Sequence, residues 1–111
     1  MVVGRSSPFG GRVRTEALLA LRLVEESYPR ELARLLQRPL SAVQRALESL
    51  EKEGLVAGRM RGRTRLVRLA PRYFAYEELR RYLERLTQPE GELRERAAAL
   101  RRRPRKAGKR L

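Results

Sequence analysis

Four arginines stand within seven residues in the segment RMRGRTR, with no acidic residue among them. They are Arg59, Arg61, Arg63 and Arg65, placed around Gly62. Because like charges this close repel one another, a folded chain that keeps them together usually has an anion outside itself to meet them. The chemistry that this segment predicts is anion binding. The alternative is a solvated loop whose charges only aid solubility.

The charge of the chain is distributed unevenly. The net charge of the 111 residues is +14, and residues 59–68 carry five arginines without an acid. Residues 101–111 carry seven further basic residues, again without an acid. The remainder is nearly neutral, as expected of one folded scaffold with two basic appendages. The length favours a single compact domain.

Several classes of chemistry are excluded by composition. Cysteine, histidine and aspartate are all missing, which removes disulfides, thiol nucleophiles and the usual ligands of zinc, haem and iron–sulfur clusters. The glutamates, tyrosines and lysines form no visible catalytic set, so we expect no enzyme, no cofactor and no metal. No apolar run is long enough to cross a bilayer, which predicts a soluble, cytoplasmic protein.

The elements that must position the arginines begin with a helix from about residue 12, after a loose arm at 1–11 rich in Ser, Pro and Gly. This helix is apolar on two sides, with Ala17, Leu18, Leu21 and Val24 on one face and Leu19 and Leu23 nearly opposite. A helix of this kind is buried on two sides. In so small a domain, the second layer is expected from a partner chain or from the chain's own core.

Two helices should follow, over about 30–37 and 41–53. Pro29 suits the first turn of one, and Ser41 with Gln44 has the spacing of a capping box at the start of the other. Val43, Leu47 and Leu50 would lie on the inner face of the second helix, and Gly54 is placed to end it.

Alternating segments at 55–60 and 65–69 then flank Gly62 and predict a β-hairpin. A further helix is expected over 72–86, and its apolar stripe continues in register to residue 100, as one kinked helix or two consecutive ones. Residues 101–111 have no apolar period and predict a disordered basic tail.

This order of elements resembles a winged helix-turn-helix domain. The segment ELARLLQRPLSAVQRALESLEKEGLVAGRMRGRTRLVRL, residues 31–69, resembles the DNA-binding core of winged-helix regulators of the ArsR type. The next segment, APRYFAYEELRRYLERL, resembles the helical extension of some of these regulators. The resemblance implies a mainly α fold with a small β-hairpin, organised as a DNA-binding domain at 12–70 and a helical dimerisation extension at 71–100.

It also implies that the helix at 41–53 enters a DNA major groove and that the arginine-rich wing, 59–65, meets the backbone or a minor groove. With Val43, Leu47 and Leu50 inward, the DNA-binding set on that helix would be Ser41, Ala42, Gln44, Arg45, Ser49 and Lys52. Arg45 is suited to a guanine edge and equally to a phosphate. Gln44 either caps the helix or contacts DNA.

A homodimer is the expected assembly. Its candidate surface consists of the second apolar side of the first helix and the stripe of the C-terminal extension, namely Leu19, Leu23, Tyr76, Leu79, Tyr82, Leu83 and Leu86. The alternative is that both stripes close the core of the single chain. Metal sensing by Cys, His and acidic clusters, which is frequent among ArsR-type regulators, does not carry over to this composition.

Three functional hypotheses remain at this level. The first is a sequence-specific regulator that binds double-stranded DNA, acting as a repressor. The second is an architectural or otherwise non-specific nucleic-acid-binding protein, and the third is an adaptor for an acidic protein partner.

Overall fold

The structure, a computed structural model, describes residues 8–102. In chain order its elements are α1 (Arg12–Val24), β1 (Glu26–Ser27), α2 (Pro29–Leu36), α3 (Leu40–Lys52), β2 (Val56–Arg61), β3 (Thr64–Leu69), α4 (Tyr76–Thr87) and α5 (Gly91–Arg102). Within the described residues the protein is mainly helical, with five helices and a three-stranded antiparallel sheet of order β1-β3-β2. This layout is compatible with the predicted winged-helix arrangement.

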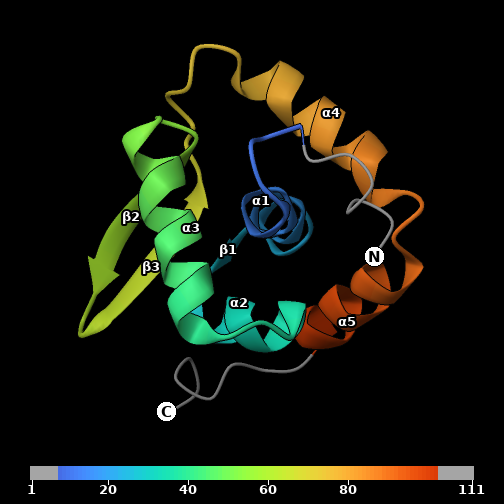
Figure 1. The fold of residues 1–111 in the computed structure, drawn as a ribbon, viewed down its shortest axis with the longest axis horizontal. Helices are drawn as coiled ribbons and strands as arrows, with labels where there is room; N and C mark the ends of the chain where they lie inside the picture. The colour runs from blue at the N-terminus through green and yellow to red at the C-terminus, as the bar shows by residue number, and fades with distance from the viewer. Residues whose placement is uncertain (1–7, 103–111) are drawn as a thin grey trace.

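Helix α1 is the centre of the molecule, and the other elements surround it (Figure 1). All residues from Thr15 to Leu21 are buried. Leu18 and Leu19 lie on different sides of the helix, and both are fully inaccessible to solvent. The two apolar sides recognised in the sequence are therefore both covered, as expected for a helix that is hydrophobic around most of its circumference.

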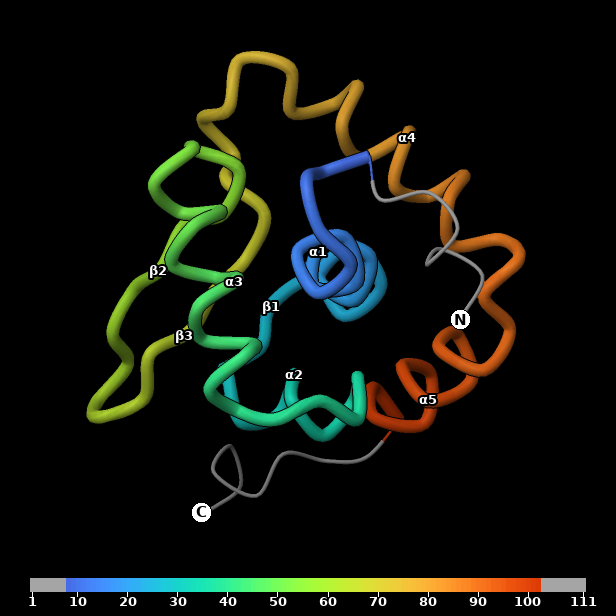
Figure 2. Tube along the Cα trace, viewed as in Figure 1, coloured from blue at the N-terminus to red at the C-terminus, as the bar shows by residue number. Residues whose placement is uncertain are grey.

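The covering of the second side comes from the same chain. Helices α4 and α5 are two separate helices, and Figure 2 shows them on the side of α1 away from the β2–β3 hairpin. Leu79, Leu83 and Leu93 of their shared stripe are buried in the core together with Leu19. Leu19, Leu79 and Leu83 of the candidate dimer surface thus lie in the core of the single chain, because α4 and α5 fold back on α1 and close that core.

The hairpin forms where the sequence predicts it, whereas one strand was not predicted and one helix begins later than expected. Strand β1 was not expected; its two residues pair with Arg68 and Val67 of β3. Two residues are too short to show an alternating pattern, so this strand gives no signal in the sequence. The helix expected from residue 72 begins at Tyr76, because residues 71–75 form turns after β3.

The connection between α2 and α3 is tight. Gln37 takes the left-handed conformation, with φ 56° and ψ 48°. Pro39 occupies the position before the first helical residue of α3, and its carbonyl accepts from the backbone N–H groups of Ala42 and Val43. Ser41 is therefore already inside the helix, and the predicted capping box is wrong, since no side chain caps α3.

The predicted arm at 1–11 and tail at 101–111 lie largely outside the described residues. Of the arm, Phe9 is half-buried and its ring centroid lies 5.9 Å from that of Tyr82. Of the tail, Arg101 and Arg102 belong to α5.

Candidate functional site

Helix α3 has one buried and one exposed face. Val43, Ala46, Leu47 and Leu50 are buried against the core. The members of the predicted DNA-binding set on this helix divide into exposed side chains, Ser41, Gln44, Arg45 and Lys52, and half-buried ones, Ala42 and Ser49. The helical period therefore placed the outer face where the structure has it.

The β2–β3 hairpin lies beside α3 (Figure 1). Arg61 and Thr64 are paired across it, so its turn consists of Gly62 and Arg63. Gly62 has φ +63°, and nothing lies within 4 Å of the position a Cβ would take. Glycine is thus favoured here by the backbone conformation of a tight hairpin turn, not by lack of space.

One arginine of the hairpin fastens it to α3. The Arg65 side chain passes over Gly58, where an added Cβ would lie 2.7 Å from Nη2 of Arg65. The same Nη2 donates to the carboxylate of Glu51 on α3. The glycine thus gives the guanidinium room to cross β2 and reach the helix.

Arg59 is directed to the other face of the sheet. Strand residues alternate between faces, and Arg59 stands across from Leu66 while Arg65 faces the side of α3. The Arg59 guanidinium pairs with Glu26, with Nε–Oε2 at 3.1 Å. The four arginines of the segment are therefore not equivalent.

Arg61 and Arg63 are the two that stay available to a partner. Both are exposed, and neither side chain makes a hydrogen bond or ion pair with any residue in the range 8–102. They lie at the turn of the hairpin, and Figure 1 shows this end of the hairpin pointing away from α1.

The acidic residues near the exposed face of α3 are mostly neutralised within the chain. Glu51 is paired with Arg65, and Glu53 accepts from Nη2 of Arg14 at 2.5 Å. Arg45 and Lys52 have no such partner among the described residues. The surface formed by α3 and the hairpin tip therefore keeps its positive charge, with Glu48 as an exposed acid within it.

Arg14 of α1 is a residue of this region that the sequence did not reveal. Besides Glu53 it donates to Ser49 Oγ at 2.5 Å and to the carbonyl of Phe9 at 2.6 Å. Ser49 is thus engaged inside the chain, which reduces its value as a contact for an external ligand. Because Arg14 is 35 residues from Ser49, no local pattern could have linked them.

The remaining members of the predicted dimer surface lie at the edge of the core. Leu23, Tyr76 and Leu86 are half-buried, and Tyr82 has 46% of its surface exposed. They form a much smaller apolar surface than the full predicted set.

The part of the chain from residue 8 to 102 contains no helix that is both long and apolar enough to cross a membrane. Nor do its acidic side chains gather in a group of three or more that suits a metal ion. Comparisons with protein-family models, curated proteins and solved structures gave no significant match. The resemblance to ArsR-type regulators therefore rests on the sequence pattern alone.

Proposed function

We propose that the protein is a winged helix-turn-helix transcriptional regulator that binds double-stranded DNA sequence-specifically. In this proposal α2 is the supporting helix, α3 is the recognition helix in the major groove, and the β2–β3 hairpin is the wing. The exposed side chains of α3 contact base edges, while the wing arginines contact backbone phosphates or a minor groove.

The observation that carries the proposal is that the β2–β3 hairpin, with the exposed and unpaired side chains of Arg61 and Arg63 at its tip, lies beside α3, whose outer face exposes Arg45 and Lys52. The bond from Arg65 to Glu51 holds the hairpin against the helix. The unpaired charges of the hairpin tip and of Arg45 and Lys52 then form one positive surface, which is the electrostatic form expected of a DNA-binding domain.

Base reading would depend mainly on Arg45. Its guanidinium can donate two hydrogen bonds to a guanine edge, which gives ~1–3 kcal/mol of discrimination against other bases. Lys52 and the wing arginines would contribute affinity without sequence preference, since phosphates are the same at every position. Bound to a promoter, such a protein would act as a repressor and would be found with the nucleoid.

We also propose that the protein binds a palindromic site as a homodimer, through an interface smaller than the one expected from the sequence. It would use the part-exposed Leu23, Tyr82 and Leu86, because Leu19, Leu79 and Leu83 are taken up by the core. Sedimentation of the protein at micromolar concentration, alone and with the selected duplex, measures this directly.

Non-specific nucleic-acid binding is the second candidate. It is favoured by the hairpin, since the available arginines of its tip would meet phosphates of any sequence. The exposed Glu48, which repels phosphate unless it accepts from a base, favours the specific reader instead.

Selection of bound duplexes from a random pool tests the proposal. We expect one enriched sequence, and we expect Arg45→Ala to lower affinity for it while relaxing the preference at one base pair. Lys52→Ala serves as the matched variant and should weaken all duplexes about equally. No enrichment with uniform binding supports the non-specific candidate, whereas absence of binding at low salt overturns both and favours an acidic protein partner.

A further inference from the structure

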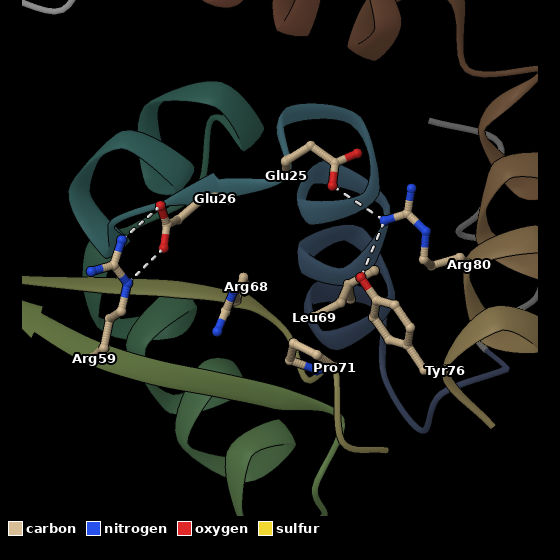
Figure 3. A pocket seen from close by; sticks show the side chains of 8 residues that line it. All are labelled: Glu25, Glu26, Arg59, Arg68, Leu69, Pro71, Tyr76 and Arg80. Carbon is tan, nitrogen blue, oxygen red and sulfur yellow. Dashed lines mark hydrogen bonds and ion pairs between the residues drawn. The ribbon is translucent and has the colours of Figure 1, made fainter. Parts of the chain in front are cut away.

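A second group of arginines lies on the face of the sheet opposite to α3. It borders a cavity of about 250 Å³ between the hairpin, the junction of α1 with β1, and the first turns of α4 (Figure 3). None of its residues belongs to the exposed face of α3 or to the hairpin tip. The proposed DNA-binding surface leaves this cavity unused.

Two arginines compete for one carboxylate at the sheet side of the cavity. Glu26 stands directly across from Arg68 in the β1–β3 pairing. Its carboxylate nevertheless accepts from Arg59, at 3.1 Å from Nε and 3.4 Å from Nη2. The Arg68 side chain is exposed and has no hydrogen bond or ion pair with the residues described, so one positive charge is left unbalanced there.

The carboxylate at the other side is also occupied. Glu25 accepts from Nη1 of Arg80 at 3.2 Å and lies 3.5 Å from a guanidinium nitrogen of Arg22. The hydrogen bond that Arg80 donates to Glu25 raises the pKa of Arg80 above its ordinary value, so Arg80 stays charged. Figure 3 shows Arg68 between these two ion pairs. Neither acid is therefore free to neutralise it.

The cavity also has apolar walls. Leu69 and Pro71 line it beside Tyr76, whose hydroxyl lies 3.5 Å from Nη1 of Arg80. Pockets for drug-sized ligands measure about 300–1,000 Å³, so this cavity admits an acidic group with a small apolar body and no more. The unbalanced positive charge and the apolar lining together favour a small ligand that has one acidic group and an apolar body.

We propose that this cavity binds a small organic anion with one carboxylate or phosphate-monoester group. The anionic group accepts from Arg68 and from Arg59, which exchanges Glu26 for the ligand, and the apolar body lies on Leu69, Pro71 and Tyr76. Because the cavity and α3 are on opposite faces of the sheet, the inference does not depend on the proposed function. Failure of either leaves the other standing.

Calorimetric titration with phenyl phosphate tests the site, with benzoate as the carboxylate probe and phenol as the neutral control. All are titrated at one ionic strength. We expect saturable binding of at least one anion, with a Kd on the order of 1 mM, equivalent to about −4 kcal/mol, and no binding of phenol. The relative affinities of phenyl phosphate and benzoate identify which acidic group the site prefers. Absence of binding by both anions, or equal binding of phenol, overturns the proposal.

Three variants test whether the anion binds in this cavity. Arg68→Ala should weaken it at least ten-fold. Glu26→Gln should tighten it several-fold, because Arg59 loses its competing carboxylate; a purely structural role of Glu26 would not produce a gain. The double variant Arg61→Ala with Arg63→Ala should leave it unchanged. If the hairpin-tip variant loses binding and Arg68→Ala keeps it, the anion binds at the DNA-facing surface and the proposal is wrong.

Discussion

Arg65 of β3 reaches across Gly58 to the carboxylate of Glu51 on α3, and this contact joins the hairpin to the helix. The two side chains retain 43% and 37% of their exposure, respectively. Exposed ion pairs contribute about 0–1 kcal/mol to stability. The main effect of the Arg65–Glu51 ion pair is therefore to position the hairpin tip relative to α3.

The variant Glu51→Gln tests whether Glu51 acts on DNA binding by positioning the hairpin or only through its negative charge. Removing an acid from a DNA-binding surface should tighten binding, because repulsion of phosphate is lost. If Glu51 instead positions the hairpin through Arg65, the same change should weaken binding to the selected duplex several-fold, with a stability change below about 1 kcal/mol. Fluorescence anisotropy and a thermal melt measure the two quantities.

Glu95→Gln is the control for that variant, since Glu95 is exposed on α5, outside the proposed DNA-binding surface, without a partner among residues 8–102. It removes the same charge without disturbing the hairpin. Tighter binding by both variants would show that Glu51 does not position anything.

The hairpin tip should determine much of the salt dependence. Each phosphate contact contributes about −0.9 to the slope of log K against log salt. With four to six contacts as the working estimate, replacing both Arg61 and Arg63 by alanine should make the slope less steep by about 1.8. The measurement is an anisotropy titration at several salt concentrations.

Arg81→Ala with Arg85→Ala is the matched control for the hairpin tip. Both residues are exposed on α4, on another side of α1, and the pair removes the same charge. An equal change of slope in both double variants would mean that net charge, not the hairpin, governs binding.

The parts of the site that the sequence predicted depend on local signals. The outer face of α3 follows from the period of Val43, Leu47 and Leu50, and the hairpin follows from alternation around Gly62. Both signals lie within a few residues along the chain. They place each arginine on its element without showing what its side chain contacts.

The contacts that the sequence did not predict join residues that are far apart along the chain. Arg14 and Arg65 reach acids 39 and 14 residues away, respectively, and nothing local marks either partner. The stripe on α4 and α5 is equally consistent with a partner chain or with the chain's own core. After β3 the chain turns back toward α1, so the stripe packs against the chain's own core. The capping box failed because Pro39 already supplies the N-terminal boundary of α3.

The pair of Glu16 and Arg38 should stabilise the α2–α3 turn against α1. Glu16 is 2% exposed, and the two hydrogen bonds from Arg38 measure 3.0 and 2.9 Å; the bond to Glu16 raises the pKa of Arg38. Glu16→Gln loses the charge-assisted pair inside the core. Since Arg38 remains about a third exposed and can be hydrated, we expect a loss of about 1–3 kcal/mol.

Urea unfolding measures that loss, and Glu48→Gln provides the same chemical change at an exposed position. The control should change the free energy of unfolding by less than about 0.5 kcal/mol. Equal effects of the two variants would show that the buried pair adds nothing beyond a surface charge.

Gln37 offers a prediction in the opposite direction. Its left-handed backbone, φ 56°, costs an L-residue about 1–2 kcal/mol that glycine does not incur. Glycine loses about 0.5–1 kcal/mol through its freer unfolded chain. Because the Gln37 side chain is exposed, Gln37→Gly should raise the free energy of unfolding by about 0.5–1 kcal/mol.

The control is Gln44→Gly, inside α3, which should lower the free energy of unfolding by about 1 kcal/mol. Denaturation midpoints of both variants measure the difference, and a loss of stability in Gln37→Gly would mean that the turn between α2 and α3 is not left-handed at this residue in solution.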